Sequence, residues 1–171
     1  MLWLALQVIS AGCSHTQTQI KKTLQSFSAD QSVAGQLHRY TREKAYTPQK
    51  ITFVENSEKD LFIQLFPTSN SLPELRILFT KNHLFVSGTR FKNPEKWHAR
   101  QNNPAFLGWQ ALAMAYLATS QVPAGKTEIR TAVYDAVYTK RNASHADAAL
   151  EFIDVFARDT DEQFAIRFFR H

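Results

Sequence analysis

Histidines are the side chains of this protein best suited to bind a metal or transfer a proton, and their spacing decides whether they could share a site. They are His15, His38, His83, His98, His145 and His171. None lies within a few residues of another, as the ligands of zinc-binding helices and loops do. The sequence therefore predicts no metal site and no cofactor.

Carboxylates, serines and glycines give no catalytic pattern either. Asp159, Asp161 and Glu162 lie in an expected turn, where acidic residues are common for conformational reasons, and Asp154 precedes it. The GxSxG corner of serine hydrolases is absent, and the five glycines are too dispersed for a phosphate-binding loop. We expect no catalytic activity, although an enzyme whose residues meet only in the folded chain stays open.

The charge of the chain narrows the class of partner. The formal net charge is +5 over 171 residues, and the basic residues occur singly or in pairs such as Lys21-Lys22 and Lys140-Arg141. A nucleic-acid-binding surface normally requires a denser basic stripe. We therefore expect no nucleic-acid partner, whereas attraction to anionic lipid headgroups is compatible with this charge.

The single cysteine, Cys13, cannot form an internal disulfide bond. It can be an unused thiol, a nucleophile or a point of covalent attachment. The twelve residues before it, MLWLALQVISAG, are uncharged and mostly apolar, and the sequence SHTQTQ after it is polar. Twelve apolar residues are too few to span a bilayer but have the length of the apolar core of a signal peptide.

This stretch resembles the lipobox of bacterial lipoproteins, in which small residues (here Ala11 and Gly12) precede a cysteine that receives diacylglycerol. The resemblance implies a signal peptide over residues 1–12, cleavage before Cys13 and a single periplasmic domain over residues 13–171. Ser10 stands where the family usually has Leu, and the lack of Lys or Arg before Lys21 is expected if the true start lies upstream. The alternative is a buried N-terminal segment with an incidental cysteine.

The residue after the lipidated cysteine implies the location. In enterobacterial lipoproteins an Asp there signals retention at the inner membrane, and this chain has Ser14. By this analogy the protein is anchored to the bacterial outer membrane and faces the periplasm, so its first partner is the membrane itself.

Hydrophobic periodicity predicts mostly strands after a short helix. Ile20, Leu24 and Phe27 form one apolar stripe on a helix that should lie on a sheet or cap an opening. The predicted strands cover 33–40, 51–54, 61–66, 74–80 and 83–91, and a closing hairpin uses 149–159 and 163–170. Residues 127–141 fit either a strand or a helix, and their Val, Tyr and Thr content favours a strand.

Two Asn-Pro pairs predict helix starts. Asn93-Pro94 should open a short helical turn, and Asn103-Pro104 should open a helix over 104–119. Gln110 is the only strongly polar residue within the second helix, so this helix must be buried on nearly all sides or meet an apolar ligand.

The element order indicates an α+β fold: a curved antiparallel sheet, similar to a half-open barrel, with an N-terminal helix and an apolar helical insertion packed on one face. This layout resembles the lipoprotein-carrier group (LolA/LolB-like), which comprises a periplasmic carrier and its outer-membrane acceptor lipoprotein. The likeness lies in element order and the lipobox, so no binding residue is transferred from that group.

Aromatic residues suggest the site. Phe53, Phe62, Phe79 and Phe85 on the sheet, closed by a helix with Phe106, Trp109 and Tyr116, could surround an apolar pocket or simply fill the core. From this group we predict a hydrophobic cleft that contains Phe85, Phe106, Trp109 and Tyr116.

We therefore expect a membrane-anchored, non-catalytic lipoprotein that binds an acyl chain, a lipid or a lipoprotein. The alternative is a structural or accessory subunit of an envelope or secretion assembly, with an envelope protein as its partner. A solvent-reaching cavity of several hundred Å³ would favour the carrier, and a filled core with an exposed apolar patch would favour the subunit.

Overall fold

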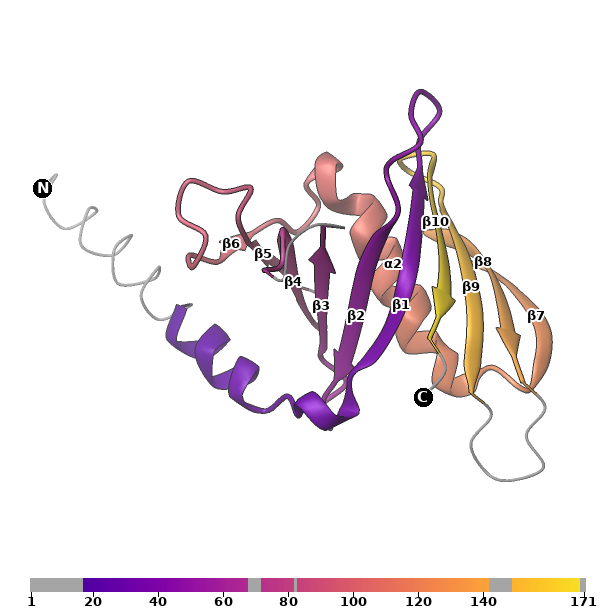
Figure 1. Ribbon diagram of the computed structural model, residues 1–171, viewed down its shortest axis with the longest axis horizontal. Coiled ribbons are helices and arrows are strands. Elements are labelled where there is room, and N and C mark those ends of the chain that lie inside the picture. The colour runs from indigo at the N-terminus through magenta and orange to yellow at the C-terminus, as the bar shows by residue number, and fades with distance from the viewer. Residues whose placement is uncertain (1–16, 68–71, 82, 142–148, 170–171) are drawn as a thin grey trace, which may run out of the picture.

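The computed structural model describes residues 17–67, 72–81, 83–141 and 149–169. They form one antiparallel sheet of ten strands in the order β6-β5-β4-β3-β2-β1-β10-β9-β8-β7 (Figure 1). The strands are β1 (Val33–Tyr40), β2 (Gln49–Glu55), β3 (Leu61–Phe66), β4 (Leu75–Thr80), β5 (His83–Ser87), β6 (His98–Ala99), β7 (Gly125–Arg130), β8 (Tyr134–Lys140), β9 (Leu150–Ala157) and β10 (Glu162–Phe168).

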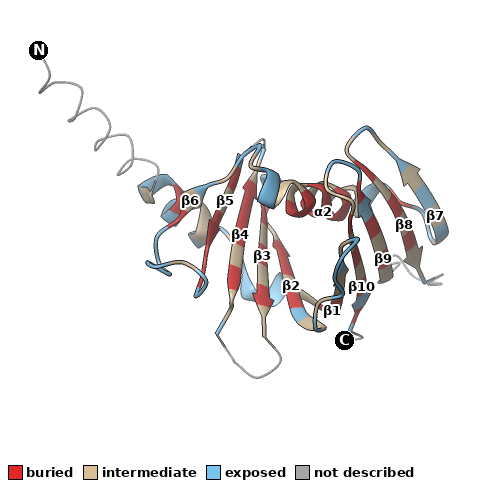
Figure 2. Cartoon of the chain, turned by 90° about the horizontal axis from the view of Figure 1, so that it is seen from above, coloured by how far each residue is buried: buried red, intermediate tan, exposed pale blue. Residues whose placement is uncertain are grey.

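The sheet is open, because β6 and β7 form its two edges and do not pair with each other. It curves around one helix, α2 (Leu107–Leu117), which lies in the concavity between the two wings of the sheet (Figure 2). The expected large antiparallel sheet with an apolar helical insertion is thus confirmed. We call β2–β6 the N-terminal half of the sheet and β1, β10, β9, β8 and β7 the C-terminal half.

The start of α2 follows from its sequence. The Asn103 side chain accepts a hydrogen bond of 3.1 Å from the Ala105 amide, and Pro104 begins the 3₁₀ turn η2 (Pro104–Phe106) that leads into the helix. These are the cap and the first-turn proline that the Asn-Pro pair predicts. A second 3₁₀ turn, η3 (Ala118–Gln121), ends this segment.

Alternation along each strand sends one set of side chains toward α2. This inner face carries Ile63 on β3, Ile77 on β4, Ile153 on β9 and Ile166 on β10, each at most 1% exposed. They belong to one continuous core that includes Leu112 of α2. The helix is therefore buried mainly as a core element.

A second, smaller cluster lies on the outer face of the N-terminal half. The helix over residues 17–25 places Ile20 against Leu78 of β4 and Trp97, while Phe62 of β3 and Phe85 of β5 pack around them. Since Phe62, Leu78 and Phe85 alternate with inner-face residues, this helix is on the opposite side of the sheet from α2. The expectation that both helices pack on one face is therefore wrong.

One other local prediction needs correction, and one is confirmed. The strand expected over 83–91 ends at Ser87, because Gly88 (φ +135°) turns the chain. The short turn expected after Asn93-Pro94 is present: the Lys96 amide donates a hydrogen bond of 3.0 Å to the Asn93 carbonyl, and the chain then enters the short strand β6.

The strand prediction for 127–141 is confirmed, as two strands rather than one. Thr131 ends β7 with a side-chain oxygen that accepts hydrogen bonds from the amides of Val133 (3.1 Å) and Tyr134 (2.9 Å), which begins β8. The closing hairpin is confirmed as β9 and β10.

Within the described residues, no helix has both the length and the apolar character needed to cross a bilayer. Cys13 and the predicted signal peptide over residues 1–12 lie outside the described residues.

Candidate functional site

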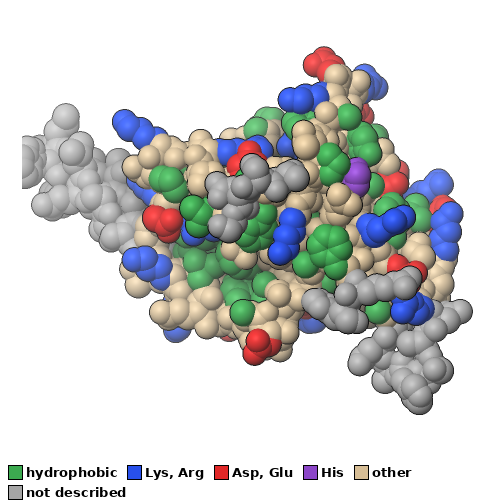
Figure 3. Space-filling model, in the orientation of Figure 1, with side chains coloured by type: hydrophobic (Ala, Val, Ile, Leu, Met, Phe, Trp, Pro, Cys, Tyr) green, Lys and Arg blue, Asp and Glu red, His purple; other side chains and the backbone are tan. Residues whose placement is uncertain are grey.

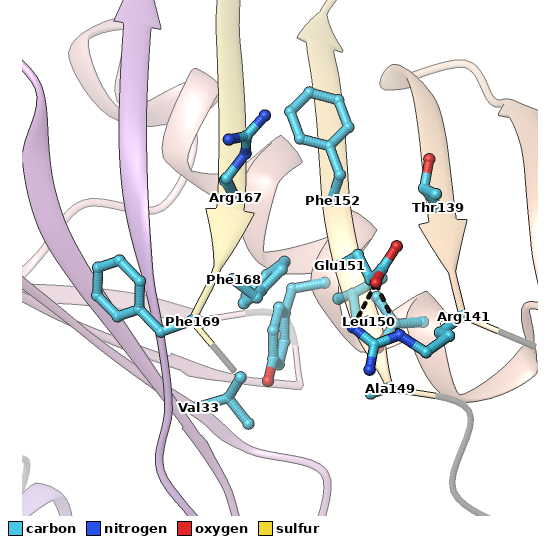
Figure 4. Close-up of a pocket in the computed structure, with 12 residues that line it drawn as sticks. Val33, Thr139, Arg141, Ala149, Leu150, Glu151, Phe152, Arg167, Phe168 and Phe169 are labelled. Atoms are coloured by element: carbon cyan, nitrogen blue, oxygen red, sulfur yellow. Dashed lines mark hydrogen bonds and ion pairs between the residues drawn. The ribbon is translucent and has the colours of Figure 1, made fainter. Parts of the chain in front are cut away.

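A cavity of about 920 Å³ lies where β10 ends, beside the C-terminal end of α2. The pairing of β10 with β9 ends at Arg167, which leaves a notch beside the first residues of β9, while on the other side the Phe169 amide still donates a hydrogen bond of 2.8 Å to the Ala34 carbonyl of β1. Figure 4 shows side chains from these strands around the notch. The lining residues are Val33, Tyr116, Thr119, Thr139, Arg141, Ala149, Leu150, Glu151, Phe152, Arg167, Phe168 and Phe169.

The inner end of the cavity is apolar and aromatic. Tyr116 stacks on Phe53 with ring centroids 4.1 Å apart and planes at 4°. Phe168 lies 6.2 Å from the Tyr116 ring and 5.9 Å from the Phe53 ring. The rings of Tyr116 and Phe168 thus form the aromatic wall of the cavity, and the buried ring of Phe53 supports them from the core.

The Tyr116 hydroxyl adds one polar atom to this wall. Burial, with a smaller contribution from the Glu55 charge, raises the pKa of Tyr116. The hydroxyl therefore stays neutral, and it has no hydrogen-bond partner among the described residues. It can donate one hydrogen bond to a ligand without introducing a charge.

The outer end of the cavity reaches the surface beside charged residues. Phe169 is 48% exposed, and Arg167 on the same strand end is also exposed. Arg141 donates two hydrogen bonds, of 2.6 and 2.9 Å, to Oε1 of Glu151, which is the only acidic residue among the described residues of the lining (Figure 4). The mouth therefore joins exposed aromatic surface to guanidinium groups.

The structure does not bring the four predicted cleft residues together. Tyr116 lines the cavity, but Phe85 lies on the outer face of the sheet, under the N-terminal helix. Trp109 is 2% exposed and packs on Phe164, with centroids 5.1 Å apart, near the other end of α2. Phe106 packs against the core beside that end.

Of the other aromatic residues assigned to the sheet, Phe53 and Phe79 belong to the inner core, whereas Phe62 faces outward. In a strand that is apolar at successive positions, the sequence does not show which side chains face the core. For this reason some of the predicted phenylalanines face the core and others face outward.

A buried ion pair fixes the N-terminal end of α2. Arg39 of β1 pairs with Glu162 of β10, and its guanidinium lies over the rings of Tyr46 (4.6 Å) and Trp109 (5.3 Å). The Glu162 carboxylate occupies the space where a side chain at Gly108 would begin. The glycine thus lets α2 approach β10 closely, and the ion pair is structural.

The described histidines form no metal site: within the described part of the chain, no three His, Cys, Asp or Glu side chains are grouped around a common point. His98 stacks on Phe91 with ring centroids 5.4 Å apart, and burial together with nearby Arg100 and Lys96 lowers its pKa. His98 is thus an imidazole ring that packs on Phe91 near two cationic side chains.

No protein-family model matches the sequence, and the search of curated proteins found no match. Among solved structures, the chain is similar to a LolA superfamily protein from Nitrosomonas europaea. The identity is 9%, the TM-score is 0.45, and the match covers 85% of this chain and 84% of the other.

Most cavity residues escaped sequence reasoning because the lining comes from five separate segments and consists largely of strand ends. Val33, Leu150 and Phe168 become neighbours only when β1, β9 and β10 are in register. Arg167 carried a local signal, since it is a basic residue at the end of an alternating strand and is followed by two phenylalanines.

Proposed function

We propose that this chain is a lipid-anchored, non-catalytic protein of the bacterial envelope that binds an acyl chain of a lipid or lipoprotein. The observation that carries the proposal is the cavity beside α2, with its aromatic wall and its opening at the sheet notch. Its volume of about 920 Å³ falls within the range of roughly 300–1,000 Å³ typical of small-ligand sites.

The energetics fit an acyl chain. Each methylene group removed from water contributes about 0.8 kcal/mol, and Val33, Leu150, Phe152 and Phe168 supply apolar surface to receive it. Ordering the ligand on binding costs several kcal/mol. The burial of a long acyl chain, with many methylene groups, exceeds this cost even when only part of the chain is removed from water.

The binding test uses a tryptophan placed in the cavity wall. Thr119→Trp should fill part of the cavity and weaken the binding of oleate about tenfold, which equals the loss of roughly two buried methylene groups. Ser120→Trp is the matched control, because Ser120 is the next residue, is exposed and does not line the cavity. Displacement of a fluorescent fatty acid measures both; equal affinity of the two variants would contradict the proposed site.

Anchoring through Cys13 has its own test. The intact mass of the mature protein extracted from membranes should correspond to cleavage before Cys13 plus attached acyl groups. Cys13→Ser should move the protein from the membrane to the soluble fraction. An unmodified thiol on a chain that retains residues 1–12 would contradict this part of the proposal.

A further inference from the structure

Arg167 faces no acidic residue directly across the strands among the described residues. Its partners across the strands are Gln36 on β1 and Phe152 on β9, and the same-face positions on either side along the chain are Ala165 and Phe169. Strand-to-strand neighbours are the residues within reach of a side chain on a sheet. Among the described residues, the positions directly paired with Arg167 therefore carry no carboxylate, and Asp154, the diagonal neighbour on β9, accepts hydrogen bonds of 2.8 and 2.9 Å from Gln163.

The row of outer-face residues that contains Arg167 includes basic residues and no acidic one. From β7 to β3 the paired positions are Lys126, Thr139, Phe152, Arg167, Gln36, Lys50 and Phe66. The acidic residues Glu128 and Asp154 lie in the next row, further from the cavity mouth. Figure 3, which views the molecule from the side opposite α2, shows Lys and Arg side chains scattered among hydrophobic ones.

Most other arginines, unlike Arg167, form an ion pair. Among the described residues, every arginine except Arg100 and Arg167 forms an ion pair with an acidic residue; these are Arg39, Arg42, Arg76, Arg90, Arg130, Arg141 and Arg158. At the cavity mouth, Arg141 pairs with Glu151, so no carboxylate among the described lining residues is left to compensate the charge of Arg167.

The cavity is thus divided by chemistry along its length. Its outer end has an unpaired guanidinium, and its inner end has the rings of Phe168 and Tyr116. A ligand with an anionic group at one end and an apolar chain at the other matches this division in a single orientation.

We propose, on the basis of the function above, that the ligand is an acyl lipid with an anionic headgroup, whose charge is bound by Arg167 at the mouth while its chain enters the notch toward Tyr116. A guanidinium forms charge-assisted hydrogen bonds with a carboxylate and with a phosphate alike. The shared chemistry is an oxyanion on an acyl chain, and a free fatty acid and an acidic phospholipid are its two sources.

The experiment compares three lipids with the same oleoyl chain: oleate, oleoyl lysophosphatidylglycerol and uncharged monoolein. Dissociation constants are measured by titration calorimetry below the micelle concentrations, for the wild type, Arg167→Leu and Arg167→Lys. Arg130→Leu is the matched control, because Arg130 lies on the same face, away from the cavity. The wild type should bind at least one anionic lipid about tenfold or more tightly than monoolein, as expected for a hydrogen bond to a charged group.

Arg167→Leu should abolish this preference and leave the affinity for monoolein unchanged, Arg167→Lys should restore part of it, and Arg130→Leu should have no effect. If Arg167→Leu weakens the binding of oleate alone, the preferred headgroup is a carboxylate. If it weakens the binding of the phospholipid alone, the preferred headgroup is a phosphate. Either result supports the inference. Equal wild-type affinity for all three lipids, or a preference that survives Arg167→Leu, overturns the headgroup inference while the acyl-binding function stands. Failure of all three to bind overturns both.

Discussion

The two halves of the sheet are covered differently. In the N-terminal half, β3 and β4 are apolar on both faces: Ile63 and Ile77 face the core, and Phe62 and Leu78 face the N-terminal helix. In the C-terminal half, β10 alternates strictly, with Phe164 and Ile166 inward and Arg167 outward and exposed. The N-terminal half is thus enclosed between two layers, whereas no helix of the described residues covers the outer face of the C-terminal half.

This difference explains where the cavity lies. A strand covered on both faces has no surface left for a ligand, and its side chains are held at the close packing of a protein interior. The C-terminal half has α2 on one side only, and its strand ends at Val33, Leu150 and Phe168 leave an opening. The C-terminal half of the sheet, which has a helix of the described residues on one face only, is therefore the half that can bind a ligand.

The largest expected effect compares the two faces of the C-terminal half. Phe164→Ala should lower the free energy of unfolding by about 3–5 kcal/mol, because Phe164 is 0% exposed and packs on Trp109. Phe156→Ala, on the outer face of β9 and 39% exposed, should cost less than about 1 kcal/mol. Urea denaturation measures both, and similar losses would mean that the outer face is also covered.

The next effect concerns the ion pair at the start of α2. Arg39→Met should destabilise the fold by about 3 kcal/mol, since it leaves the Glu162 carboxylate buried without a counter-charge. Arg158→Met removes an exposed pair with Asp135, at 44% and 38% side-chain exposure, and should cost below about 1 kcal/mol. If both substitutions cost the same in urea denaturation, the Arg39 pair does not fix the helix.

A smaller effect tests the second layer of the N-terminal half. Ile20→Ala should cost about 2 kcal/mol and speed hydrogen exchange across residues 17–25, because Ile20 (3% exposed) is the buried contact of this helix. Lys21→Ala, at the exposed neighbouring position, is the control. Unchanged exchange in Ile20→Ala would show that the helix is held by other contacts.

The smallest effect separates binding from stability. Arg167→Leu should change the free energy of unfolding by less than about 0.5 kcal/mol, because its side chain is exposed and makes no ion pair with a described residue. A loss well above this value in urea denaturation would assign Arg167 a structural role and weaken its assignment to the ligand.

Strand positions could be predicted because alternation and turn residues are local signals. The side of the sheet on which the N-terminal helix packs could not, since a single apolar stripe fits either face. A signal was nevertheless present: the apolar runs LFI at 61–63 and ILF at 77–79 leave no polar face, unlike QFAIRF at 163–168. Such runs predict strands covered on both sides.

The cavity was beyond sequence reasoning for a different reason. It forms where the pairing of β10 with β9 ends, and the ends of strands are set by long-range register rather than by local pattern. Tyr116 was identified through its place on an apolar helix, but its three companions Phe85, Phe106 and Trp109 serve packing elsewhere.

The most direct test of an acyl site in the C-terminal half is to locate a bound chain. Methyl-labelled protein is titrated with a spin-labelled stearate, and broadening of methyl resonances reports proximity to the label. We predict selective broadening of Val33 and Leu150, which line the cavity, with Leu78 and Ile77 of the N-terminal half unaffected. Broadening centred on Leu78 and Ile20, or none at saturating ligand, would contradict the account.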